Sequence, residues 1–223
     1  MRIAQVITRA LSDTIAQKGH GRIAFPGGRS AVELMSELSH VSIDWSSVSV
    51  TLVDERAVDE SSNASNAALV KSTLCQNAAE KATFEPMFIA DDAQQSADQL
   101  NQQRCPLDIA VLGMGDDGHF ASLFPDEIAV PGLADGRLGF VATRAVGSPS
   151  VPRISMTLGQ ILSAQLVVLL VSSDAKKDKV MDGLKSVDSM NPVGYLLASD
   201  HPILVVWPGG DMVTVHNGVV YES

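Results

Sequence analysis

Residues 166–185 read LVVLLVSSDAKKDKVMDGLK, and they contain the clearest structural signal in the chain. The first six, Leu166 to Val171, form an uninterrupted apolar run of the length of a buried strand. A short serine-containing turn follows, and residues 175–185 have the pattern of a helix. A buried strand that leads through a short loop into a helix is the repeating unit of a parallel α/β sheet.

The same unit recurs along the chain. Strands are expected at 23–25, 48–53, 107–112, 139–143 and 203–207, and helices at 1–18, 31–38, 63–74, 94–103 and 158–163. Residues 213–220, around Asn217-Gly218, have the pattern of a final hairpin. We therefore expect one α/β domain over residues 1–223. Its sheet is doubly wound and parallel-rich, with helices on both faces and a C-terminal antiparallel edge hairpin. Ligands of such sheets bind outside the carboxyl ends of the strands.

Composition excludes several classes of protein. The formal net charge of −10 argues against a nucleic-acid partner, because phosphate backbones require a basic surface. The two cysteines, Cys75 and Cys105, are too few for a disulfide framework. No apolar run approaches the ~18 residues of a membrane span, and no secretory signal is visible. We expect a cytoplasmic protein without membrane partners.

A glycine loop, Gly27-Gly28-Arg29-Ser30, ends the first expected strand and precedes a helix. Glycines let a backbone approach a ligand closely, and a helix start offers free N–H groups to an anion. A tight turn with Ser30 as the N-cap explains the pattern equally well. No Gly-Lys-Ser/Thr follows, so this loop is not a P-loop.

Two acids and an arginine, Asp54-Glu55-Arg56, end the next expected strand, and Asn66 follows in the chain. A surface ion pair is the commoner fate of such a triplet. Their place at a strand's carboxyl end favours function instead, and Arg56 is suited to bidentate phosphate binding.

The most informative segment is 113–125, GMGDDGHFASLFP, in which His119 follows a strand, a glycine turn and two acids. We expect His119 to begin a helix, where its imidazole is able to act as a general base near neutral pH. Gly115 and its neighbours would let a substrate carbonyl sit against backbone N–H groups, as in an oxyanion hole.

Two further cations come from other strand ends. Lys176 lies in the first turn of a helix, where the helix dipole disfavours a cation, and this hints at a ligand. Arg153 alone would carry little weight. No Gly-x-Ser-x-Gly elbow is present, and the histidines show no metal-ligand spacing. The partial Gly-x-Gly-x-x-Gly match at 113–118 lacks the acidic residue of a dinucleotide site.

These segments, in this order, resemble the 6-phosphogluconolactonase family, and the match runs from the first strand to the helix after Lys176. The resemblance implies hydrolysis of 6-phosphogluconolactone to 6-phosphogluconate in the oxidative pentose phosphate pathway, without metal or cofactor. It implies a catalytic set and a group of substrate and phosphate contacts. By resemblance the base is His119, and the contacts are Arg56, Arg153 and Lys176. To these we add Asp54 and Asp117 as expected catalytic residues, and Gly27, Gly28, Arg29, Ser30, Asn66 and Gly115 as expected substrate or phosphate contacts. The chain departs from the family pattern at Arg29, where a hydroxyl residue is usual, and at Phe120, where threonine is usual.

Two other functions occur on the same fold. An amino-sugar phosphate deaminase would carry an acid before the proline, but this chain has Leu123-Phe124-Pro125. A sugar-phosphate sensor would carry a DNA-binding segment, and no basic helix-turn-helix is present. The sequence leaves the oligomeric state open.

Overall fold

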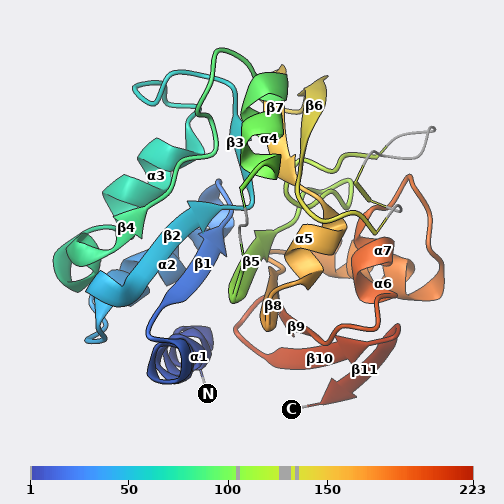
Figure 1. The fold of residues 1–223 in the computed structure, drawn as a ribbon. Coiled ribbons are helices and arrows are strands. Elements are labelled where there is room, and N and C mark those ends of the chain that lie inside the picture. Colours follow the sequence, from blue (N-terminus) through green and yellow to red (C-terminus); the bar gives the residue numbers. More distant parts are fainter. Residues whose placement is uncertain (1, 104–105, 126–131, 134–135, 223) are drawn as a thin grey trace.

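The computed structural model describes residues 2–103, 106–125, 132–133 and 136–222 (Figure 1). Its α-helices are α1 Ile3–Lys18, α2 Val32–Ser39, α3 Asn66–Thr73, α4 Ala93–Asn101, α5 Leu158–Leu162, α6 Asp174–Lys185 and α7 Val193–Leu197. Short 3₁₀ helices are η1 Arg29–Ala31, η2 Trp45–Ser47 and η3 Asn77–Lys81. The first strands are β1 Gly21–Phe25, β2 Val48–Leu52, β3 Asp54–Arg56, β4 Thr83–Phe84, β5 Ile109–Gly113 and β6 Phe140–Val146. The later strands are β7 Val151–Met156, β8 Leu166–Leu170, β9 Ile203–Val206, β10 Met212–His216 and β11 Val219–Glu222.

The main sheet has eight strands in the order β11-β10-β9-β8-β5-β1-β2-β4. From β4 to β9 all neighbours are parallel, and β10 and β11 add antiparallel strands at one edge. Helices flank this sheet (Figure 1). The expected parallel-rich α/β sheet with a C-terminal antiparallel hairpin is therefore confirmed.

Aliphatic side chains form the core, as the low aromatic content requires. All of β2 and nearly all of β5 and β8 are buried, which is why these strands read as continuous apolar runs. The largest fully buried side chains include Trp45, Phe25 and Phe120. Phe120, the departure from the family's threonine, is thus a core residue.

A second sheet of three antiparallel strands, in the order β3-β7-β6, was not expected from the sequence. The triplet Asp54-Glu55-Arg56 forms a strand of its own rather than the loop after β2. Its partner, β7, pairs it so that Asp54 lies opposite Ser155 and Arg56 opposite Arg153. In Figure 1 this small sheet stands above the main one, beside α4.

The expectation that His119 begins a helix is wrong. Residues 115–123 form a tight loop, closed by isolated bridges from Phe120 to Met114 and to Leu123. Gly118 and Ala121 adopt positive φ values of 85° and 48°, and residues in that region interrupt a right-handed helix.

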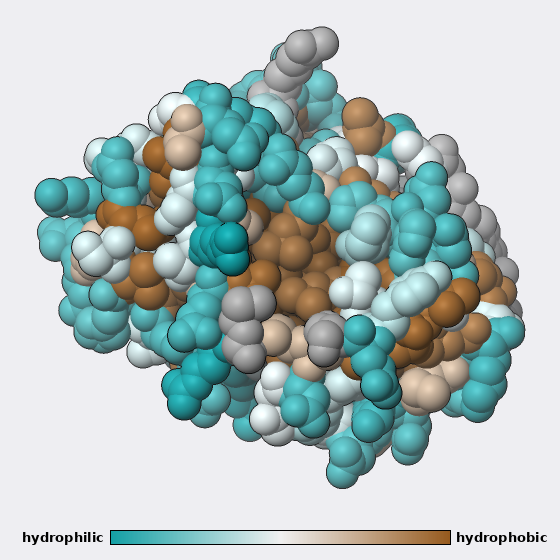
Figure 2. Space-filling view, turned by 90° about the horizontal axis from the view of Figure 1, so that it is seen from below, coloured by the Kyte–Doolittle hydropathy of each residue, from teal (hydrophilic) through white to brown (hydrophobic). Residues whose placement is uncertain are grey.

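Figure 2 shows the molecule from below, on the side where both chain ends lie in Figure 1. Apolar surface gathers near the centre of this face, inside a polar rim. The carboxyl ends of β1 and β2 point the other way, so the candidate site lies on the opposite side. No helix within the described ranges is long and apolar enough to cross a membrane.

Candidate active site

A cavity of about 480 Å³ opens at the carboxyl ends of β1, β5 and β8, with the small sheet as a further wall. It collects nearly every residue that the sequence assigned to the site. These are Gly27, Gly28, Arg29, Ser30, Asp54, Arg56, Asn66, Gly115, His119, Arg153 and Lys176. Asp117 is the exception, because it contacts His119 from outside the cavity wall.

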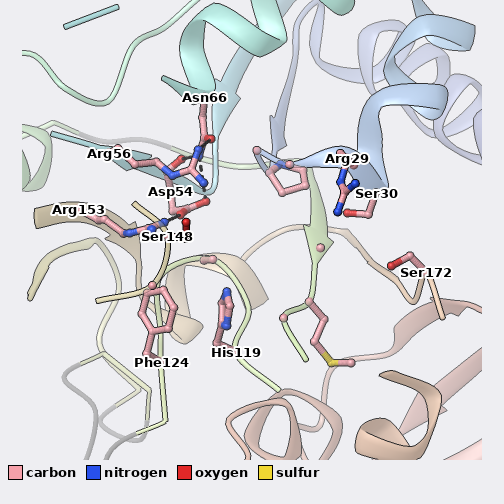
Figure 3. A pocket seen from close by; sticks show the side chains of 18 of the residues that line it. Arg29, Ser30, Asp54, Arg56, Asn66, His119, Phe124, Ser148, Arg153 and Ser172 are labelled. Carbon is pink, nitrogen blue, oxygen red and sulfur yellow. Dashed lines mark hydrogen bonds and ion pairs between the residues drawn. The ribbon is translucent and has the colours of Figure 1, made fainter. Parts of the chain in front are cut away.

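His119 points its ring into the cavity (Figure 3). Its Nδ1 atom lies 2.5 Å from Oδ1 of Asp117, and its backbone N–H donates to the same oxygen over 3.2 Å. Burial acts to raise the pKa of Asp117, but the hydrogen bond and charge of His119 outweigh it and lower that pKa. An ionised Asp117 favours the tautomer that carries the proton on Nδ1, and in that tautomer the lone pair is on Nε2.

Gly115 makes room for the histidine ring. A Cβ atom at this position would lie 2.2 Å from Nδ1 and Cε1 of His119, so a larger residue would displace the base. The Gly115 N–H donates to the His119 carbonyl over 2.8 Å, and the Gly118 N–H donates to the Gly115 carbonyl over 3.2 Å. The glycine turn therefore fixes the imidazole at the end of β5.

Two arginines stand side by side on the small sheet. Arg56 of β3 pairs in register with Arg153 of β7, and like charges placed directly opposite destabilise a strand pair. Burial, followed by the charge of Arg56, lowers the pKa of Arg153, while Asp54 and Glu55 oppose that shift. The Nε atoms of both arginines are buried and make no hydrogen bond within the described structure. Such an arrangement suits an anion that would accept from both side chains.

Asp54 is buried behind the two arginines. Its Oδ2 accepts from the Ser122 hydroxyl over 2.5 Å and lies 3.9 Å from Nη1 of Arg153. Asn66 donates to the Asp54 carbonyl oxygen over 2.8 Å and accepts from Nη1 of Arg56. These contacts make Asp54 a counterion of Arg153, and its expected catalytic role stays a prediction.

Glu55 points away from the cavity and holds the start of α3. Its carboxylate accepts from the backbone N–H groups of Arg56, Asn66 and Ala67 over 2.7–2.8 Å. Burial is the largest influence and raises the pKa of Glu55, although these backbone donors act against it. The residue thus ties β3 to the helix that carries Asn66.

Arg29, Ser30 and Lys176 come from the ends of the other strands. Figure 3 shows Arg29 and Ser30 across the cavity from Arg56 and Arg153. Ser30 is no N-cap, because it lies inside η1 and α2 begins after Ala31 without a side-chain cap. The largely buried Lys176 lies 3.8 Å from the exposed Asp116.

Sequence reasoning missed several lining residues: Phe124, Gly147, Ser148 and Ser172. Phe124 stands inside the quoted histidine motif, but the sequence assigned no role to it. Ser148 belongs to the turn between β6 and β7, which could be placed only once that sheet was known. No three His, Cys, Asp or Glu side chains of the described residues are grouped to hold a metal ion.

The fold and the cavity define a class: an α/β protein in which a histidine paired with an aspartate and a group of cationic side chains lie at the carboxyl ends of the strands. The family model for glucosamine-6-phosphate isomerases/6-phosphogluconolactonase matches residues 1–207, and the chain belongs to this family.

Individual relatives agree with that assignment. A 6-phosphogluconolactonase of Mesorhizobium japonicum is 37% identical over 213 residues, covering 92% of this chain and 87% of the relative. One of Caulobacter vibrioides is 34% identical over 214 residues, covering 92% and 90%. A crystal structure of a 6-phosphogluconolactonase from Shewanella baltica matches with a TM-score of 0.84 at 32% identity, covering 92% and 91%. The expected resemblance to the lactone-hydrolysing branch of the family is confirmed.

Proposed function

We propose that this chain hydrolyses 6-phospho-D-glucono-1,5-lactone to 6-phosphogluconate, the lactonase step of the oxidative pentose phosphate pathway. One observation carries the proposal: the cavity that His119 lines, with Asp117 hydrogen-bonded to it from behind, is also walled by the arginine pair of the small sheet. The substrate has groups to match both: a carbonyl that would lie at His119 and a phosphate that would lie at Arg56 and Arg153.

His119 acts as the general base. Asp117 holds the proton on Nδ1, so Nε2 accepts a proton from a water molecule as that water attacks the lactone carbonyl. The water oxygen bonds to C1, and the carbonyl becomes a tetrahedral oxyanion beside backbone N–H groups of the Gly27-Gly28 loop, because those of Gly115 and Gly118 already donate within the histidine loop. The ring C–O bond then breaks, and protonated His119 returns its proton to the departing ring oxygen. Water is the nucleophile, so no covalent enzyme intermediate forms.

The arginine pair binds the phosphate. A phosphate group carries close to two negative charges, and it would accept from both guanidinium groups and relieve their mutual repulsion. Arg153 is 4% exposed, so its contact with an anion is shielded from solvent. Arg29 and Lys176 supply further positive charge across the cavity.

The test is a coupled assay on freshly made 6-phosphogluconolactone, with unphosphorylated glucono-1,5-lactone and glucosamine 6-phosphate as comparison substrates. His119→Ala should lower kcat by about 10²–10⁴-fold on both lactones. Arg56→Ala should cost roughly tenfold to hundredfold in kcat/KM on the phosphorylated lactone and far less on the other. Turnover of glucosamine 6-phosphate in place of the lactone would refute the proposal, and equal losses by Arg56→Ala on both lactones would remove Arg56 from phosphate binding.

A further inference from the structure

The Phe124 ring contacts both His119 and Arg153. Its ring centroid is 4.3 Å from that of His119, with the ring planes tilted by 34°. The guanidinium carbon of Arg153 lies 5.4 Å from the same ring centroid. Figure 3 shows the Phe124 and His119 rings side by side at the cavity wall, with Arg153 close to Phe124. One side chain therefore contacts both functional ends of the site.

The position of this ring is closely confined. A Cβ atom at Gly147 would lie 2.9 Å from Cζ of Phe124 and 3.0 Å from Nη2 of Arg153, so the backbone of residue 147 closes over both groups. Phe124 is only partly buried and lines the cavity, whereas Phe120 of the same loop is fully buried core. The ring is thus placed at the site and does not serve to fill the interior.

Hydrogen bonds from Ser122 also connect the histidine loop, residues 115–123, to the three-stranded sheet. Ser122 donates its hydroxyl to Asp54 over 2.5 Å, and its backbone N–H donates to the Ser155 hydroxyl over 3.1 Å. Between His119 and Ser122, Ala121 adopts a φ of 48°, a conformation that side chains other than glycine tolerate only when their surroundings enforce it. The histidine loop is therefore clamped onto β3 and β7 with little freedom.

We propose that Phe124 is a positioning residue that sets the spacing between His119 and Arg153, and hence between the reacting carbonyl and the phosphate of the substrate. This inference rests on the proposed function. A rigid ring in contact with both groups transmits a change on one side to the other. A substrate bound by its phosphate at Arg153 is then presented to His119 at a fixed distance, and misplacement by even 1 Å is costly in such geometry.

The experiment compares Phe124→Leu, which removes the aromatic ring, with Phe124→Tyr, which keeps it. Met114→Leu serves as the matched control, because Met114 is an apolar lining residue outside the proposed machinery. Phe124→Leu should lower kcat on both lactones by roughly twofold to tenfold through His119. It should also raise KM by roughly twofold to thirtyfold through Arg153, but only on the phosphorylated lactone. Phe124→Tyr keeps the ring but adds a hydroxyl at the confined Cζ, so it should retain most of the activity that Phe124→Leu loses. Met114→Leu should stay near wild type.

Phosphate-induced stabilisation provides a readout that does not need turnover. Inorganic phosphate should raise the Tm of the wild-type protein, and Phe124→Leu should reduce that rise while Phe124→Tyr preserves it. If the wild type shows this rise but no lactonase activity, the proposed function fails while the link between Phe124 and Arg153 is still measured.

Two outcomes would overturn the inference: Phe124→Leu behaving like the wild type in both measurements, or Phe124→Tyr losing as much as Phe124→Leu. Phe124→Met carries the same expectation as the leucine variant and replaces it if that protein does not fold.

Discussion

Replacing Asp117 with asparagine is expected to lower kcat only about tenfold. The carboxylate contacts Nδ1 of His119 at 2.5 Å, and a hydrogen bond to a charged group contributes ~1.5–3 kcal/mol. The Asp117 side chain is 48% exposed, however, so water screens its charge and the lower end of that range applies. At ~1.4 kcal/mol per decade this is about tenfold. By contrast, replacing the buried aspartate of a Ser-His-Asp triad with asparagine lowers kcat by ~10⁴-fold.

The assay is steady-state hydrolysis of fresh 6-phosphogluconolactone, followed through a dehydrogenase that consumes the product. Asp116→Asn is the matched control, because it removes the same charge from the adjacent position without touching the His119 ring. A loss beyond about a thousandfold would show that solvent does not screen Asp117, contrary to its exposure. An unchanged kcat would show that the pair does not act in the reaction.

Three further outcomes are expected. For Glu55, the folded-state pKa is raised above its ordinary value of 4.5, so its contribution to stability is full below that value and falls as pH rises through the folded pKa. The wild type should therefore lose stability relative to Glu55→Gln as the pH rises above 4.5, measured by urea unfolding. Gly115→Ala should lower kcat while leaving the circular dichroism spectrum unchanged, because the new methyl group meets the imidazole at 2.2 Å. Ser122→Ala should lower the unfolding free energy by about 1–3 kcal/mol in urea titrations, because buried Asp54 loses a donor.

The main sheet could be predicted because its long strands have a recognisable local sequence pattern. Residues 166–171 are apolar throughout, since the strand is buried on both faces, and the glycine and acidic residues at strand ends mark where the chain turns. Parallel order then brings those ends to one edge of the sheet. For this reason the sequence alone was enough to group Gly27, His119 and Lys176 correctly.

The small sheet could not be predicted in the same way. β3 is three residues long and polar, and its identity as a strand depends on β7, which lies far along the chain. No local period reveals such a partner. The prediction that His119 begins a helix was wrong for a related reason. Ala121 has a high helix propensity, but the bridges around Phe120 and the hydrogen bonds of Ser122 hold it at positive φ. Phe124 was overlooked because its role comes from contacts with residues on two different elements.

The acidity of the chain and the anionic substrate are compatible once distance is considered. The net charge of −10 is spread over the whole molecule, and at physiological salt such charges are screened beyond about 8 Å. Under the proposed function, Arg56 and Arg153 would contact the phosphate directly, and the burial of Arg153 weakens the screening of its charge. Asp54 lies 3.9 Å from Arg153, and the Nε atoms of both arginines have no hydrogen-bond partner in the described structure. If the pair binds the phosphate as proposed, the local field in the cavity governs that affinity, and the net charge of the surface does not.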